Sequence, residues 1–250
     1  MVSETTCSLP SALRSWWSDQ RKQTSALAAF GRLLALAWEF GRDSLPDRRR
    51  QRYGDIDYDW EHRVNTTGAT VSWRARLLGL LNSPYQPVPP EQFHEMMSAL
   101  ALRLRDVSDF SQFTFIDIGS GKGRALLLAS EYGFRRIVGV ELLPELDRIA
   151  RQNVRNFGKP GVTAAIELVC MDARSFNFPV EPSVIFLFNP LIEPGLRALL
   201  RRLERSLRQS PRPLYVAYLN PVLELTFADS SLLTKLGGTH QYSLFSGLVR

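Results

Sequence analysis

Three glycines at alternate positions, directly after a short apolar run, constrain this chain more than any other feature. The apolar run covers residues 113–118, the glycines are Gly119, Gly121 and Gly123, and a helical apolar pattern follows over residues 124–129. Such an order predicts a buried strand, a tight turn and a helix. Glycine lets a ligand approach the backbone closely, and the start of a helix presents unpaired N–H groups. The segment therefore predicts a site for a nucleotide-like ligand.

Short apolar runs and helical patterns alternate from residue 113 onward, which is typical of a parallel sheet covered by helices on both faces. The sequence predicts strands at residues 113–118, 137–140, 166–171, 184–188, 214–219 and 242–249. It predicts helices at residues 144–156 and 194–208, and one that begins near Pro90. We expect the last strand to be antiparallel and to lie at the end of the sheet. The predicted fold class is α/β and Rossmann-like.

We divide the chain into an N-terminal helical cap at residues 1–83 and a domain at residues 84–250. An apolar stripe over residues 26–40 predicts a helix at residues 24–41 that is buried or docks on a protein surface, or alternatively lies on a membrane surface. A charge interrupts the stripe, and it is too short to span a membrane. Acids alternate with apolar residues over 55–61. This pattern predicts an edge strand with a solvated face, or alternatively a face that binds a cation.

Composition excludes several classes of protein. The net charge of +6 over 250 residues is mildly basic, so an acidic partner is permitted but not required. The two cysteines, Cys7 and Cys170, imply no disulfide framework and fit a reducing compartment. The three histidines have no spacing that would assemble a metal cluster. We therefore expect a cytoplasmic protein without a metal site and without a transmembrane segment.

A polar residue stands at the end of four successive predicted strands. These residues are Asp117, Glu141, Asp172 and Asn189. In an open α/β sheet the ligand binds at the carboxyl ends of the strands. We therefore expect the four side chains to converge on one site.

Three nucleotide-binding patterns compete for the glycine segment. A P-loop needs a glycine five residues before its Gly-Lys pair and Ser or Thr after it, but Ile116 and Gly123 occupy those places. A dinucleotide fold needs G-x-G-x-x-G, whereas this chain has G-x-G-x-G preceded by Asp117. A carboxylate there would repel a pyrophosphate and attract the ammonium group of an amino acid. This favours S-adenosylmethionine, which has a cationic methionine end, a ribose and an adenine but no phosphate.

Four motifs make residues 84–250 resemble the class I S-adenosylmethionine-dependent methyltransferases. The motifs are Asp117-Ile118-Gly119-Ser120-Gly121-Lys122-Gly123, Val140-Glu141, Met171-Asp172-Ala173 and Phe188-Asn189-Pro190. The first motif and the run at 184–189 are also similar to the histone-lysine methyltransferases of the telomeric-silencing type. Residues 64–68 and 85–89 are similar to the lead-in of a group of bacterial methyltransferases of unassigned substrate.

The resemblance implies a seven-stranded sheet with an antiparallel last strand and a defined set of cofactor contacts. The glycines would back the cofactor, Asp117 would lie near its methionine end, Glu141 would accept from the ribose hydroxyls, and Asp172 from the adenine amino group. The cofactor-binding residues that we predict are Asp117, Gly119, Ser120, Gly121, Gly123, Glu141, Asp172, Ala173 and Asn189.

The predicted catalytic residues are Asn189, Pro190 and Tyr85. An Asn-Pro-Pro-aromatic sequence at this place is the pattern of amino-group methylation on bases and glutamine. In this chain Leu191 and Ile192 follow Pro190, so a flipped base would lack its stacking aromatic. Tyr85 is expected to replace that aromatic or to close over the cofactor, unless it only packs at an edge.

The sequence therefore predicts an S-adenosylmethionine-dependent methyltransferase that acts on a nitrogen or other nucleophile. A non-catalytic S-adenosylmethionine-binding module and a Rossmann oxidoreductase are the alternatives. The acceptor is left open among a protein, a small molecule and a nucleic acid, and so is the oligomeric state. Four arginines on one face of the helix at 194–208 predict a solvated face, or alternatively contacts to phosphates: Arg197, Arg201, Arg205 and Arg208.

Overall fold

The computed structural model of the chain describes residues 56–67, 86–104, 110–157 and 165–247, and five single residues between 25 and 34. Tyr85 lies outside the described residues. The domain boundary expected after residue 83 also lies outside them, so it stays a prediction.

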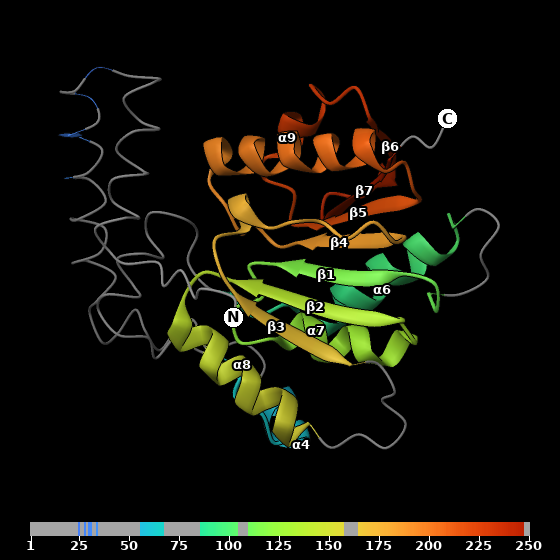
Figure 1. The fold of residues 1–250 in the computed structure, drawn as a ribbon. Helices are drawn as coiled ribbons and strands as arrows, with labels where there is room; N and C mark the ends of the chain where they lie inside the picture. Colours follow the sequence, from blue (N-terminus) through green and yellow to red (C-terminus); the bar gives the residue numbers. More distant parts are fainter. Residues whose placement is uncertain are drawn as a thin grey trace, which may run out of the picture.

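A seven-stranded sheet forms the centre of the molecule (Figure 1). Its strands are β1 (Thr114–Ile118), β2 (Arg136–Glu141), β3 (Ile166–Cys170), β4 (Ser183–Leu187), β5 (Leu214–Leu219), β6 (Leu233–Gly238) and β7 (Tyr242–Gly247). The order across the sheet is β3-β2-β1-β4-β5-β7-β6. Strand β7 pairs antiparallel with both β5 and β6, and the remaining pairs are parallel. The predicted Rossmann-like α/β fold with an antiparallel last strand is confirmed.

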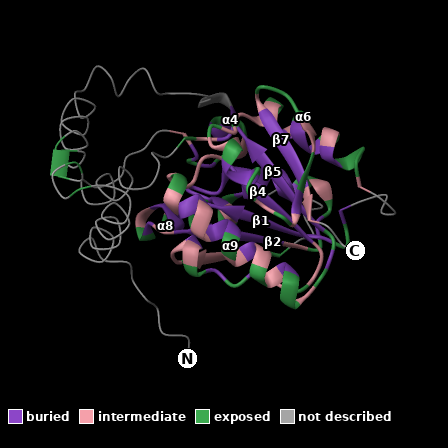
Figure 2. Cartoon of the chain, turned by 90° about the horizontal axis from the view of Figure 1, so that it is seen from above, coloured by how far each residue is buried: buried purple, intermediate pink, exposed green. Residues whose placement is uncertain are grey.

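Helices cover both faces of this sheet (Figure 1). One face carries α6 (Pro90–Ala101), α7 (Arg124–Ala129) and α8 (Pro144–Asn156), and the other carries α9 (Glu193–Gln209). Shorter elements are α4 (Ile56–His62) and three 3-10 turns, η1 (Ser130–Tyr132), η2 (Ala173–Ser175) and η3 (Glu224–Phe227). Figure 2 shows buried residues concentrated in the strands between the two helical layers.

The central strands are buried on both faces, which explains why their sequences are continuously apolar rather than alternating. All residues of β1, β4 and β5 are buried. Along β1, Phe115 belongs to the core under α6 and α7, and the next residue, Ile116, belongs to the core under α9. The α9 leucines predicted to face the sheet are buried as well: Leu196, Leu199, Leu200, Leu203 and Leu207.

The predicted position of the last strand was wrong. Strand β7 is antiparallel as expected, but it lies between β5 and β6, and β6 is the edge of the sheet. The sequence of β6 gave no strand signal because it is half exposed, ends in Gly237 and Gly238, and contains a register shift between Lys235 and Gly237. Glycine is rare in strands, and an edge strand needs no continuous apolar face.

The acidic stretch at residues 55–61 was also predicted wrongly. Residues 56–62 form the helix α4 instead of an edge strand. Neighbouring acids two residues apart point in nearly opposite directions on a helix, so the four acids do not all share one face. One of them, Asp59, is buried.

Within the helix predicted at residues 24–41, the structure describes Ser25, which is not helical, and four residues that are helical and exposed: Ala28, Phe30, Gly31 and Leu34. In the described ranges, no helix combines the length and apolar character that crossing a membrane requires.

Helix α6 should be part of the folded core, because Phe93 in its first turn is fully buried. The centroid of the Phe93 ring lies 5.4 Å from that of Phe186. We expect Phe93→Ala to lower the free energy of unfolding by about 3–5 kcal/mol. The control is Leu102→Ala, just after the same helix and 87% exposed, with an expected change below about 0.5 kcal/mol. Urea denaturation measures both. Equal effects would contradict the packing described.

Candidate functional site

The carboxyl ends of β1 and β2 bring two predicted site residues together on one face of the sheet. In the register of these strands, Asp117 lies opposite Gly139. Glu141 is two residues beyond Gly139 on the same strand, so its side chain points to the same face. Asp117 is 3% exposed and Glu141 is 6% exposed. Two acids are thus buried close to each other.

This acid pair is short of positive charge. Burial, and then the charge of Glu141, raises the pKa of Asp117 well above the usual range. Burial also raises the pKa of Glu141, although hydrogen bonds from the backbone N–H groups of Leu143 and Gly121 lower it. Those two bonds are 2.8 Å each. Among the described residues, none donates a hydrogen bond to the Asp117 carboxyl group. Buried carboxylates without a partner favour a cationic ligand.

The three glycines between β1 and α7 all adopt left-handed backbone conformations. Their φ angles are 79° at Gly119, 54° at Gly121 and 88° at Gly123. A Cβ atom built on Gly119 would lie 2.5 Å from the Cβ of Pro190, so any side chain there would collide with it. The glycine segment therefore packs directly against the Asn189-Pro190 motif, which follows β4.

Ser120 lies between the first two glycines, but its hydroxyl group turns toward the sheet. A Cβ atom on Gly139 would lie 2.9 Å from the Oγ atom of Ser120. This Oγ atom is buried and has no hydrogen-bond partner, and the Ser120 N–H donates to the Val140 carbonyl at 3.0 Å. The side chain thus fills the space that the missing Cβ of Gly139 leaves.

Asp172 and Ala173 follow β3, as predicted, and Asp172 forms an ion pair that the sequence analysis missed. Its Oδ1 atom accepts from the backbone N–H of Arg174 at 2.8 Å and thereby caps η2. The Arg174 guanidinium group also donates to Oδ2 at 2.6 Å. An acid followed two residues later by arginine is too common a pattern to have indicated this pair.

Asn189 is held in place by a tyrosine from the neighbouring strand. Its backbone has a left-handed φ of 47°, and its Oδ1 atom accepts from the hydroxyl group of Tyr218 at 2.8 Å. The backbone N–H of Leu223 donates to the same hydroxyl group at 3.3 Å. The hydroxyl group thus accepts from Leu223 with a lone pair and donates its one proton to Asn189. This hydrogen bond fixes the orientation of the Asn189 amide. Burial raises the pKa of Tyr218, so the phenol stays protonated. Sequence analysis predicted the strand at residues 214–219 that contains Tyr218 and assigned no role to this residue.

Lys122 does not point toward a phosphate site. It is fully buried, and its Nζ atom donates to the Oδ1 atom of Asn65 at 2.9 Å and to the carbonyl of Thr67 at 2.8 Å. This position agrees with the sequence argument against a P-loop.

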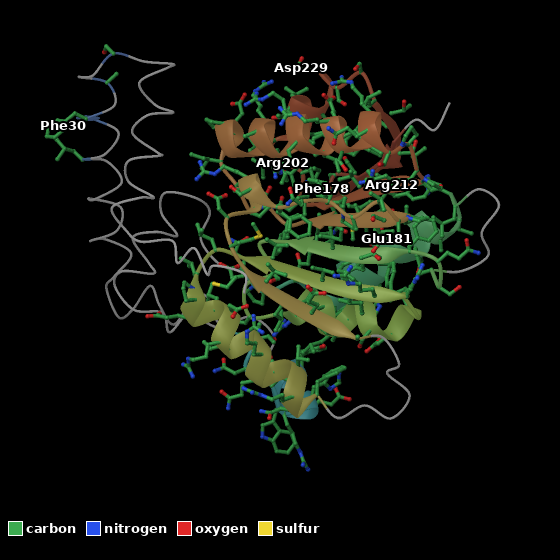
Figure 3. The ribbon with its side chains drawn as sticks, viewed as in Figure 1. Phe30, Phe178, Glu181, Arg202, Arg212 and Asp229 are labelled. Atoms are coloured by element: carbon green, nitrogen blue, oxygen red, sulfur yellow. The ribbon has the colours of Figure 1, made fainter. Side chains whose placement is uncertain are left out.

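Two of the four α9 arginines singled out in the sequence form surface ion pairs. Arg197 contacts Glu193 and Asp229, and Arg208 contacts Glu204. Figure 3 labels Asp229 on the α9 side of the sheet. Arg201 and Arg205 are exposed. These contacts favour the solvated face over a phosphate-binding face.

Within the described ranges, no three His, Cys, Asp or Glu side chains gather as a metal ion would need. The four strand-end residues thus have three different environments. Asp117 and Glu141 form a buried acid pair, Asp172 pairs with Arg174, and Asn189 is held by Tyr218. Tyr85, the remaining predicted site residue, lies outside the described residues.

Comparison with protein families identifies the central part of the chain. Residues 115–210 match a family model described as a methyltransferase domain. The matched range contains the glycine segment and all four strand-end residues. The match supports a methyltransferase over a Rossmann oxidoreductase. No curated protein matches the chain.

Several solved structures of methyltransferases are similar to this chain at low identity. A ribosomal protein L11 methylase from Lactobacillus delbrueckii subsp. bulgaricus is 14% identical, with 64% of this chain and 79% of that chain covered and a TM-score of 0.43. An RNA methyltransferase from Salinibacter ruber in complex with S-adenosyl-L-homocysteine is 19% identical, with 64% and 92% covered and a TM-score of 0.41. A predicted N6-adenine-specific DNA methylase from Listeria monocytogenes is 16% identical, with 61% and 50% covered and a TM-score of 0.45. The acceptors that these names give, a ribosomal protein, RNA and DNA, are those of the three similar proteins.

Binding of a cation beside Asp117 should strengthen as the pH rises. The raised pKa keeps Asp117 protonated at pH values where an ordinary aspartate is ionised, and a protonated carboxyl group does not attract an ammonium group. We expect the affinity for S-adenosylmethionine to rise as the pH rises through this pKa, and binding to release protons. Calorimetry in buffers of different ionisation enthalpy measures the release. In Asp117→Asn the release should shrink, and an unchanged value would contradict the assignment.

Proposed function

We propose a nitrogen acceptor and a set of site residues for this chain, which is an S-adenosylmethionine-dependent methyltransferase with its methyltransferase domain at residues 115–210. The observation that carries the site assignment is the buried acid pair of Asp117 and Glu141. A ligand with an ammonium group and a sulfonium group compensates this excess of negative charge, whereas a pyrophosphate would increase it.

We assign the methionine and ribose ends of the cofactor to the ends of β1 and β2. Asp117 pairs with the ammonium group, and Gly119, Gly121 and Gly123 form a surface without side chains behind the methionine portion. Glu141 accepts from the ribose hydroxyls. Each of its carboxylate oxygens already accepts one backbone N–H, and each retains lone pairs for a ligand. One residue thus shapes the glycine segment and binds the cofactor.

We assign the adenine end to Asp172 and Ala173 after β3. The adenine amino group would share the Asp172 carboxylate with Arg174, which holds this carboxylate in a fixed orientation. Ala173 is buried beside it and adds an apolar contact. Ser120 supports the site from the side of the sheet, because its side chain occupies space next to Gly139.

Asn189 and Pro190 are the residues that we assign to the acceptor. S-adenosylmethionine supplies, when bound, a methyl group on a positively charged sulfur that a nucleophile displaces in line. The protein aligns the nucleophile and excludes water. Pro190 packs on Gly119, so this motif adjoins the glycine segment. The Oδ1 atom of Asn189 retains a lone pair after it accepts from Tyr218. This atom and the backbone carbonyl of Asn189 together accept the N–H groups of the acceptor amine.

The finer features of the acceptor rest on the sequence. Leu191 and Ile192 follow Pro190 where base-modifying enzymes carry a stacking aromatic, and we propose Tyr85 for that task. The acceptor molecule is a protein, a small molecule or a nucleic acid.

We also propose a catalytic domain at residues 84–250, a cap at residues 1–83 and a cytoplasmic location.

The acid pair is tested by calorimetric titration with S-adenosylmethionine. We expect Asp117→Ala and Glu141→Ala each to weaken binding by about tenfold or more, the effect of losing about 1.4 kcal/mol. Asp229→Ala, at a side chain 70% exposed on the α9 side, should bind like the wild type. Failure of the wild-type protein to bind would overturn the cofactor site.

The acceptor motif is tested with tritiated S-adenosylmethionine and a cell lysate separated into protein, nucleic acid and small molecules. We expect one fraction to be labelled, and Asn189→Ala to lower the rate of labelling by about a hundredfold. The matched control is Asn220→Ala. Asn220 also follows a strand, precedes a proline and has a left-handed φ of 49°, and its replacement should leave the rate within about twofold. Label on an oxygen or sulfur atom would contradict a nitrogen acceptor.

A further inference from the structure

The glycine segment is contacted from outside the sheet by residues 58–67, called here the lead-in segment. The side chain of Asn153, on α8, joins the two. Its Nδ2 atom donates to the Lys122 carbonyl at 2.9 Å and to the Asn65 carbonyl at 3.0 Å. Its Oδ1 atom accepts from the Asn65 N–H at 2.8 Å. Asn153 is 2% exposed, so these bonds are made away from water and are strong.

The two basic residues that flank Gly123 also hold the lead-in segment. Lys122 contacts the Asn65 side chain and the Thr67 carbonyl, as described above. Arg124 is 2% exposed, and its Nε atom donates to the Oγ1 atom of Thr66 at 2.5 Å. The Arg124 guanidinium group also lies 4.8 Å from the centre of the Tyr58 ring, in a cation–π contact. Both cations are therefore directed away from the acid pair.

Asp59 supplies the negative charge on the side of the lead-in segment. Its Oδ2 atom accepts from the backbone N–H groups of Thr66 at 2.7 Å and Thr67 at 2.6 Å. Its Oδ1 atom accepts from the Thr66 hydroxyl and pairs with Arg124 at 3.3 Å. Burial acts to raise the pKa of Asp59, but the threonine hydrogen bonds outweigh it and leave the pKa below the usual value. The carboxylate is thus ionised and fixed.

The glycine segment needs such support because fixing its conformation costs entropy. Glycine loses more conformational freedom on folding than any other residue, and all three glycines here have positive φ. The segment is restrained on the sheet side by Glu141, which accepts from the Gly121 N–H. On the opposite side, the Lys122 carbonyl is restrained by Asn153, which is itself bonded to Asn65.

We propose that docking of the lead-in segment sets the conformation of the glycine segment, and hence the affinity for the cofactor, with Asp59, Thr66 and Asn153 as positioning residues. The proposal rests on the assignment of the glycine segment to S-adenosylmethionine. Because coupling between two sites is reciprocal, binding of the cofactor stabilises the docked lead-in segment in turn. None of the three residues needs to touch the cofactor for this effect.

The hydroxyl group of Thr66 offers the sharpest variant, since it bridges Asp59 and Arg124. Thr66→Val keeps the shape and removes the bridge, whereas Thr66→Ser keeps the bridge. We expect Thr66→Val to weaken S-adenosylmethionine binding by about tenfold, within the usual range for coupled sites, and Thr66→Ser to restore most of the affinity. Calorimetry measures both on protein shown to be folded by circular dichroism. Wild-type affinity in Thr66→Val would overturn the proposal.

Asn153→Ala tests the second connection, with Gln152→Ala as the control at an exposed position of the same helix. We expect about tenfold weaker binding in the first variant and wild-type binding in the second. Equal affinities would overturn the role of Asn153. If the wild-type protein does not bind S-adenosylmethionine, the proposed cofactor site itself fails, which is a different outcome.

Hydrogen exchange tests the reciprocal effect in the unaltered protein, so it does not depend on how any variant folds. We expect S-adenosylhomocysteine at saturation to slow exchange of the amides of Asn65, Thr66 and Thr67 by about tenfold. Amides of β6, at the far edge of the sheet, serve as the control and should be unaffected. Unchanged exchange of the lead-in amides with the ligand bound would overturn the proposal.

Discussion

The burial of Asp117 beside Glu141 is the constraint on which the organisation of the site depends. Burial, and then the charge of Glu141, disfavours the ionised form of Asp117 and raises its pKa, so an ionised pair requires a compensating cation. Glu141 obtains part of this compensation from two backbone N–H groups, and one of these comes from Gly121. The remaining need for positive charge supports the proposed placement of a cationic cofactor at this end of the sheet.

The nearby cations are held away from the acid pair, so the acid pair still lacks positive charge. Lys122 and Arg124 follow Asp117 within seven residues and could in principle neutralise it. The lead-in segment prevents this, because Asn65, Thr66 and Asp59 satisfy the two cations on the other side of the glycine segment. The charges that influence the pKa of Lys122 are accordingly those of Asp59 and Arg124, after burial. The lead-in segment thus protects the acid pair from an internal partner.

Local patterns predicted most of the sheet and its central turn. The sequence located α8 at residues 144–156 and β5 at residues 214–219 with the bounds that the structure has. Helix α8 has a clear helical periodicity of apolar residues, and β5 is a continuous apolar run. It failed for β6, whose glycines and exposed face carry no such periodicity. It also failed for residues 55–61, where alternating acids resemble an edge strand. One of those acids is buried in α4 by partners that lie elsewhere in the chain.

The sequence by itself determined the strand, the glycines and the acids at the strand ends, because these features depend on chain order and on periodicities of a few residues. It also predicted a methyltransferase with S-adenosylmethionine as its cofactor. Only the tertiary structure decided that Arg124 pairs with Asp59 and that Tyr218 holds Asn189. These partners are 65 and 29 residues apart. No short-range pattern encodes such pairs, since they form only when the packed sheet and helices bring distant segments together.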